Sequence, residues 1–287
     1  MKITSIHTGY IKLDGGAMFG VVPKRMWQAM TPPDSQNMCT WAMRALLVET
    51  GSRKILIDTG IGNKQDARFR AHFEPHGEES LFGSLHKAGL DRSDITDVLL
   101  THLHFDHCGG ALWNNPDSGS IEPAFPNAVY WTNERHYQWA IRPNPREKAS
   151  FLAENFVPLW EAGILQFIDI RQNIEFVPGF NIRFLYGHTE AMMAPVIHAG
   201  PHAVVYCADL IPSRWHIGLP YVMAYDIRPL QTMEERAALL EEAVREKYIL
   251  FFEHDPAEEA GRVRADLQTE RIVLESSGPL SSFLPVV

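Results

Sequence analysis

The chain has 287 residues, 45% of them hydrophobic, and 26 Lys+Arg against 35 Asp+Glu give a formal net charge of -9. This length and apolar content predict one globular domain over residues 1–287 with a full core. The acidic balance and the lack of a basic run argue against a nucleic-acid partner. No stretch approaches the roughly 18 apolar residues that span a bilayer, so no membrane association is expected.

The first residues and the cysteines bear on the compartment. Met1–Ile6 alternates as a strand does and lacks the unbroken apolar run of a secretory signal. The three cysteines, Cys39, Cys108 and Cys207, are odd in number and far apart, which argues against a disulfide framework. We therefore expect a soluble, cytoplasmic protein in which Cys108 and Cys207 are small buried apolar residues.

The predicted elements begin as strands and then mix strands with helices. Turn residues at 50–53 separate a strand at Met43–Glu49 from one at Lys54–Asp58, and apolar spacing predicts a helix over Glu78–Ala88. Residues 15–41 carry Met and Trp without a regular period, which indicates a long loop. Further strands are predicted at 129–131, 166–168, 174–177, 182–186, 195–198, 203–207 and 249–252, and a helix at 233–247.

The motif Thr-His-Leu-His-Phe-Asp-His at 101–107 follows an apolar strand and holds four side chains that commonly ligate metals. Residues two apart in an extended segment point to one side, so His102 and His104 can bind one ion. Asp106 and His107 are adjacent, and a turn into a helix at the following Cys-Gly-Gly would direct them to a second ion. An accidental match is improbable, at about one in a thousand.

Three more candidate ligands occur downstream, because a binuclear site needs more than four side chains. His188, Asp209 and His254 each come just after a predicted strand. Loops at the carboxyl ends of strands gather at one edge of a sheet, so these side chains can converge there.

Together these segments resemble the metallo-β-lactamase-fold superfamily of metallohydrolases over nearly the whole chain. Within it, the sequence is similar to the YtnP-like quorum-quenching lactonases, and methyl parathion hydrolases share much of the pattern. The matching segments are Asp58-Thr59-Gly60, the HxHxDH motif, Gly187-His188-Thr189, Asp209 and His254-Asp255, with 14–24, 208–212 and 251–255 for the lactonases.

The resemblance implies an α/β (α+β) fold, a four-layer αββα sandwich of two mixed β-sheets flanked by helices. It also implies a homodimer and two divalent metal ions, zinc or another transition metal. Asp58 would orient a metal ligand, although an aspartate there can also simply start a turn. The implied ligands are His102, His104 and His188 for one ion, Asp106, His107 and His254 for the other, and Asp209 as the bridge.

The implied activity is hydrolysis of a lactone ring, with N-acyl-homoserine lactones as the leading small-molecule substrate. A hydroxide between the ions would attack, and Asp106 would carry the proton. The alternatives are hydrolysis of an organophosphate triester or of another carboxylic ester at the same site. A non-catalytic protein on a degenerate fold is disfavoured, because all seven ligand positions are filled. One departure is Pro212, where many lactonases have a tyrosine.

Apolar residues of two segments are candidates for the substrate pocket. The segment 15–41 either covers a core face or a dimer partner, or forms a wall for an acyl chain or aryl group. The loop after Asp209 is similarly apolar and aromatic. Four histidines outside the ligand set, His72, His76, His86 and His136, are expected to be solvated. The candidate pocket residues are Phe19, Trp27, Trp215, His216 and Met223.

Overall fold

The computed structural model describes residues 1–171 and 174–284. Two compact units alternate along the chain, the first formed by Met1–Tyr10 and Met43–Arg171, the second by Ile11–Ala42 and Gln172–Val287. The chain passes between the units inside two long strands, which are β1 (Lys2–Asp14) and β2 (Met38–Thr50).

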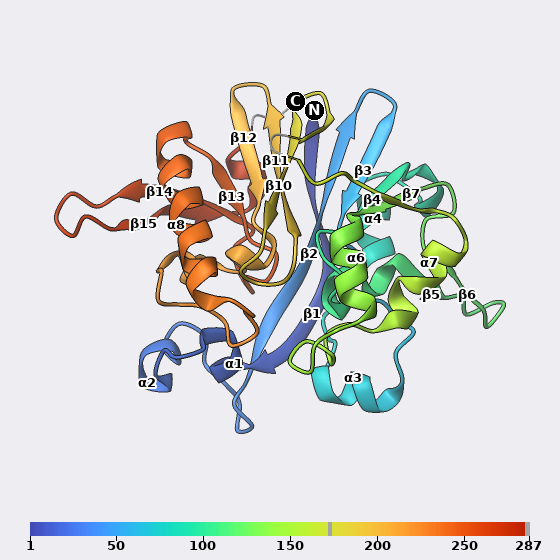
Figure 1. The fold of residues 1–287 in the computed structure, drawn as a ribbon, viewed down its shortest axis with the longest axis horizontal. Helices are drawn as coiled ribbons and strands as arrows, with labels where there is room; N and C mark the ends of the chain where they lie inside the picture. The colour runs from blue at the N-terminus through green and yellow to red at the C-terminus, as the bar shows by residue number, and fades with distance from the viewer. Residues whose placement is uncertain (172–173, 285–287) are drawn as a thin grey trace. The chain divides into compact units, whose positions relative to one another are not determined.

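The first unit contains a six-stranded mixed sheet in the order β1-β2-β3-β4-β7-β8 (Figure 1). β2 and β3 form the expected antiparallel hairpin, and β3, β4, β7 and β8 are parallel neighbours. Parallel strands require crossover connections, and helices lie in each of these connections. The remaining strands of this sheet are β3 (Arg53–Ile57), β4 (Asp97–Leu99), β7 (Val129–Thr132) and β8 (Leu165–Phe167).

Helices and a small hairpin complete the first unit. Its core consists of apolar side chains from the sheet and the connections, among them Leu47, Leu56, Val98 and Tyr130, all buried. The helices are α3 (Ala67–Phe73), α4 (Leu81–Lys87), α5 (Phe105–Cys108), α6 (Glu134–Ile141) and α7 (Val157–Glu161), with 3-10 turns at Arg92–Asp94, Gly109–Ala111 and Ala153–Asn155; the hairpin is β5 (Leu112–Asn114) with β6 (Ile121–Pro123).

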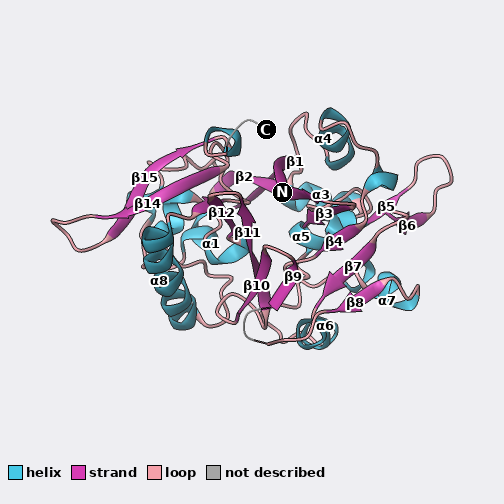
Figure 2. Ribbon diagram, turned by 90° about the horizontal axis from the view of Figure 1, so that it is seen from above, coloured by secondary structure: helices cyan, strands magenta, loops and turns pink. Residues whose placement is uncertain are grey.

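The second unit contains a seven-stranded sheet in the order β15-β14-β13-β12-β11-β10-β9. Its only parallel pair among the described strands is β12 with β13, and the crossover between them includes helix α8, which Figure 2 shows beside this sheet. The strands are β9 (Ile174–Val177), β10 (Phe180–Leu185), β11 (Met192–Ala199), β12 (His202–Tyr206), β13 (Ile249–Phe251), β14 (Ala260–Ala265) and β15 (Ile272–Gly278).

The helical segments of this unit include two that the sequence did not indicate. Residues 15–41 were expected to form a long loop, but they contain α1 (Gly15–Phe19) and α2 (Lys24–Trp27), and β2 begins at Met38. Asp14 caps α1 by accepting a hydrogen bond from the Ala17 amide. The other segments are α8 (Pro229–Glu246) and 3-10 turns at Ala208–Leu210, Arg214–Ile217 and Leu280–Ser282.

The expectation of two mixed sheets with flanking helices is confirmed. Two helix starts differ from the prediction for local reasons. α4 begins at Leu81 because Ser80 caps it, and α8 begins at Pro229, a residue that favours the first helical turn. Within the part of the chain that the structure describes, no helix is both long and apolar enough to cross a membrane.

Candidate metal centre

The HxHxDH motif lies in the first unit, at the point where β4 ends and α5 begins. His102 lies before α5, His104 is the extended N-cap residue of α5, and Nε2 of His102 lies 3.1 Å from Nδ1 of His104. α5 starts at Phe105, before the Cys-Gly-Gly where the turn was expected, so Asp106 and His107 lie within one helical turn. All four candidate ligands are buried. The motif therefore places His102 and His104 before the helix and Asp106 and His107 within it.

Two buried side chains, Glu147 and His136, contact the segment 102–104. Nε2 of His104 faces the Glu147 carboxylate at 3.8 Å, and Glu147 is 2% exposed. His136 accepts a hydrogen bond at Nε2 from the Leu103 amide, 2.8 Å away, between the two candidate ligands. The expectation that His136 is solvated is wrong, because α6 places it in the core. Neither contact could be found from local spacing.

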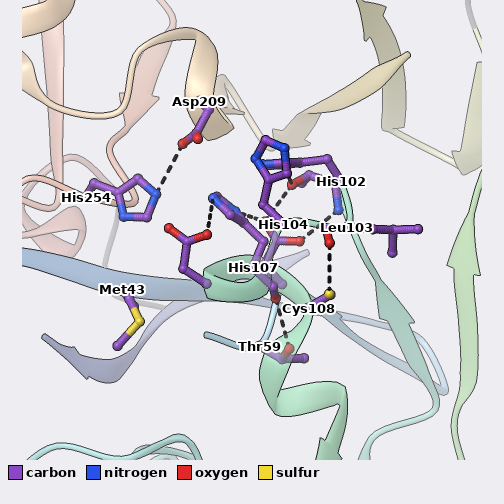
Figure 3. A network of polar contacts seen from close by, with 12 residues as sticks. Met43, Thr59, His102, Leu103, His104, His107, Cys108, Asp209 and His254 are labelled. Carbon is purple, nitrogen blue, oxygen red and sulfur yellow. Dashed lines mark hydrogen bonds and ion pairs between the residues drawn. The ribbon is translucent and has the colours of Figure 1, made fainter. Parts of the chain in front are cut away.

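Asp58 holds the other half of the motif. Its carboxylate accepts hydrogen bonds from the amide and hydroxyl of Thr101, both at 2.7 Å, and lies 3.1 Å from Nδ1 of His107. Its backbone is left-handed, with φ of 59°, a strained conformation for a residue other than glycine. Thr59 then donates from Oγ1 to the His107 carbonyl at 2.9 Å, as Figure 3 shows. This geometry fits the predicted role of Asp58 in orienting a ligand.

The three downstream candidates meet in the second unit. Asp209 places one carboxylate oxygen 3.0 Å from Nε2 of His188. Its other oxygen lies 3.1 Å from Nε2 of His254, as Figure 3 shows. All three side chains are buried. Asp209 follows β12 in a 3-10 turn whose first residue, Ala208, has a left-handed φ of 43°. A carboxylate between two imidazoles is the arrangement expected of a bridging ligand.

The outer nitrogens of these two histidines also have fixed partners. Nδ1 of His254 lies 2.8 Å from the Ala42 carbonyl, and Nδ1 of His188 lies 2.8 Å from the Asp226 carboxylate. Burial acts to lower the pKa of His188, but the carboxylates of Asp209 and Asp226 outweigh it and raise that pKa to about 10. Asp226 was not among the predicted residues, because it lies in an irregular loop with no motif around it.

The chemistry of these donors fits divalent metal ions. Each of the five histidines directs one ring nitrogen at a protein group, and this fixes which nitrogen faces the other candidate ligands. Imidazole nitrogens together with carboxylate oxygens are the ligand types that zinc binds in hydrolases. Within each unit, the protein itself therefore orients the candidate ligands for metal binding.

The five candidate pocket residues all belong to the second unit, and Phe19, Trp27, Trp215 and His216 form an aromatic cluster. The ring of Phe19 stacks on Trp27 with centroids 5.4 Å apart and on His216 at 5.2 Å. Trp215 packs against the same Phe19 at 6.4 Å and is the only one of the five that is not fully buried. Met223 is buried, and its amide donates to Asp226 at 3.0 Å. The Asp226 carboxylate thus contacts both His188 and the backbone of the loop that carries Met223.

Comparison with known proteins identifies the class. The chain matches the family model of the metallo-beta-lactamase superfamily over residues 44–254, a span that includes all seven candidate ligands. It belongs to this superfamily and is a metal-dependent hydrolase. The fold described above is the one expected for the class.

Particular relatives share low identity along most of their length. An N-acyl homoserine lactonase from Bacillus sp. is 24% identical over 245 residues, which cover 81% of this chain and 87% of the relative. The probable metallo-hydrolase Rv2300c of Mycobacterium tuberculosis is 25% identical over 240 residues, 74% of each chain. These relatives span most of the chain, so the similarity is not confined to the HxHxDH motif.

Solved structures resemble the chain over nearly its whole length. A probable metal-dependent hydrolase from Staphylococcus aureus has a TM-score of 0.85 and 26% identity, covering 100% of this chain and 98% of its own. AidC, a dizinc quorum-quenching lactonase solved with the product N-hexanoyl-L-homoserine, has a TM-score of 0.76 and 22% identity, covering 97% and 94%. At this identity, the likeness to AidC establishes the fold.

Proposed function

We propose that the protein is a lactonase with two metal ions, which hydrolyses N-acyl-homoserine lactones. The observation that carries this proposal is the position of Asp209, whose two oxygens each face a ligand-type nitrogen, one on His188 and one on His254. Relatives named as N-acyl homoserine lactonases support the substrate class. The proposed ligands are those that the superfamily motif assigns: His102, His104, Asp106, His107, His188, Asp209 and His254.

When bound, two divalent ions supply the Lewis acidity that activates water and polarises an ester carbonyl. The residues of the chain fix the positions of the ligands around them. Asp58 holds the His107 ring through Nδ1, and Asp226 holds the His188 ring in the same way. Such preorganisation lowers the reorganisation needed during the reaction.

Asp106 is the proposed proton carrier. Its residue is buried, but its side chain is 12% exposed, whereas the neighbouring His107 side chain is fully buried. A carboxylate in this position can take a proton from the attacking water and deliver it to the alkoxide that leaves when the ring opens. The aromatic cluster around Phe19 would contribute the apolar contacts to the acyl chain, with Trp215 as its accessible member.

Metal content and substrate preference test the proposal separately. Loaded and dialysed protein should contain two ions per chain by elemental analysis. Asp209→Asn should lose at least one of them, and lactone turnover should fall at least about a hundredfold. Asp117→Asn, a change of the same type at an exposed aspartate, should alter neither quantity. One ion or none in the loaded wild-type protein would contradict the two-metal assignment.

The alternative activity is hydrolysis of an organophosphate triester at the same site. The value of kcat/KM for N-hexanoyl-homoserine lactone should exceed that for paraoxon by at least about a hundredfold, or roughly 2.7 kcal/mol in transition-state stabilisation. The reverse preference would establish the alternative. Size-exclusion chromatography with light scattering should show a homodimer, the state that family resemblance suggests.

A further inference from the structure

A cavity of about 220 Å³ lies entirely within the first unit, and its lining includes none of the seven proposed metal ligands. Leu81 and Phe82 of α4 and Trp113 of β5 form its apolar wall. Its lining also includes Thr59, the residue after Asp58, and Gly110, which follows α5. We propose that this cavity is a second binding site, for a small, neutral aromatic molecule.

The wall is held in place by its own contacts. Nε1 of Trp113 donates to the Glu122 carboxylate at 3.0 Å, and the Arg92 guanidinium lies 4.7 Å from the Trp113 ring. Phe82 meets Trp113 edge to face, with centroids 5.0 Å apart. A preformed aromatic surface binds a flat ring without the entropic cost of ordering side chains.

The chemistry of the lining selects a neutral ligand. Among residues 1–171 and 174–284, no charged side chain lines the cavity. The polar groups there are already bonded within the protein: Thr59 donates to the His107 carbonyl, and Asn63 exchanges two hydrogen bonds with the Asn114 backbone. An ion would therefore lose its hydration without a partner. Pockets for drug-sized ligands measure about 300 to 1,000 Å³, so this cavity suits one or two fused rings.

Two of the lining residues, Thr59 and Gly110, belong to loops next to the candidate metal ligands. The amide of Thr59 donates to the His107 carbonyl at 2.8 Å, and the amide of Gly110 donates to the Gly60 carbonyl at 2.8 Å. The loops touch so closely that a Cβ on Gly110 would lie 2.3 Å from the Thr59 carbonyl oxygen. A ligand in contact with Thr59 and Gly110 should stabilise both hydrogen bonds against local opening.

Fluorine NMR with 5-fluoroindole tests the site without any assay of hydrolysis. We expect one saturable site with a Kd between about 10 µM and 1 mM, as befits a ligand of ten heavy atoms. Trp113→Leu removes one of the two aromatic rings of the wall, and Leu81→Trp fills the cavity, so each should weaken binding at least tenfold. Trp160→Leu is the matched control, since Trp160 is a half-exposed aromatic of the same unit outside the cavity, and it should bind as the wild type does.

Hydrogen exchange provides the second readout. Saturating 5-fluoroindole should slow exchange at the Thr59 and Gly110 amides, whereas the amides of β14 in the second unit should be unaffected. The proposal is overturned if the wild type shows no saturable binding up to 2 mM probe, or if Leu81→Trp binds as the wild type does. The test does not require either variant to lose lactonase activity. A negative result would therefore not count against the proposed function.

Discussion

The His188 ring lies between two carboxylates, with Nδ1 2.8 Å from Asp226 and Nε2 3.0 Å from Asp209. The other oxygen of Asp226 accepts the Met223 amide at 3.0 Å. Asp226 therefore fixes the orientation of a proposed metal ligand and, through the same carboxylate, the position of the aromatic loop. This relationship makes it the most informative residue outside the motif.

Asp226→Asn should weaken metal binding about tenfold to a hundredfold, the usual effect of changing a group that orients a ligand. The carboxylate charge of Asp226 increases the basicity of His188. The amide of the variant keeps the shape of the carboxylate but lacks this charge. Competition with a chromophoric chelator measures the effect. Asp169→Asn, at an aspartate whose side chain is 75% exposed, is the control and should match the wild type. Equal affinity in both variants would show that Asp226 only supports the loop.

Lys64 stabilises the turn that follows α5 by donating hydrogen bonds to its backbone. Its ammonium donates to the Gly109 carbonyl and, at 3.3 Å, to the Leu112 carbonyl. Lys64→Met leaves both acceptors without this donor, so the free energy of unfolding should fall by about 1 to 3 kcal/mol. Denaturant titration measures it, with Lys148→Met at an exposed lysine as the control. A loss below 0.5 kcal/mol, roughly the noise for surface changes, would contradict this role.

The same lysine gives a pH dependence with a defined sign. Burial lowers the pKa of Lys64 to about 8, even though Cys108 and Glu154 act to raise it. Between that value and about 10.4, the ordinary value, the unfolded chain binds more protons than the folded chain, so this group makes stability rise with pH. The difference between wild type and Lys64→Met should therefore grow in favour of the wild type from pH 8 to 10. A difference that is constant or shrinks would be inconsistent with a buried ammonium.

His216 should make the protein sensitive to acid. Nδ1 of its ring lies 2.7 Å from the Ser213 hydroxyl and Nε2 lies 2.9 Å from the Met18 carbonyl, which fits a neutral imidazole. Burial, with a smaller contribution from Arg236, lowers its pKa to about 3. Stability from this group is complete above pH 6.5 and is lost as the pH falls towards 3, by up to about 1.4 kcal/mol per pH unit.

His216→Gln should remove that slope while keeping some polar contacts. Unfolding free energies measured from pH 7 to pH 4 should fall less steeply in this variant than in the wild type. His198→Gln is the control, because His198 is an exposed histidine of the same unit. Parallel curves for all three proteins would mean that His216 does not stay neutral in the folded chain.

The contrast between these residues shows what the sequence could predict. The motif at 101–107 was readable because its spacing is local and the strand before it fixes the direction of the side chains. Asp226 is 38 residues from His188, and His136 is 33 residues from Leu103. Their contacts arise from tertiary packing, which periodicity does not encode. In the same way, α1 and α2 are too short to leave a periodic pattern.

Pro212 stands where many related lactonases have a tyrosine. Pro212 is buried, and its carbonyl accepts the His254 amide at 2.9 Å, so its backbone helps to position a proposed ligand. If the metal ions already stabilise the leaving alkoxide, an added phenol contributes little. Pro212→Tyr should then change kcat/KM for N-hexanoyl-homoserine lactone by no more than about tenfold, roughly 1.4 kcal/mol.

Pro212→Ala is the matched variant for this test, because it removes the ring without adding a hydroxyl. Any loss common to both variants reports on the backbone that holds His254, and only the difference between them reports on the phenol. A gain well above tenfold in Pro212→Tyr over Pro212→Ala would mean that the native site lacks a group that lactone opening needs. Hydrolysis of paraoxon, whose aryloxide leaves without protonation, would then become the favoured activity, and its kcat/KM should be unchanged by the tyrosine.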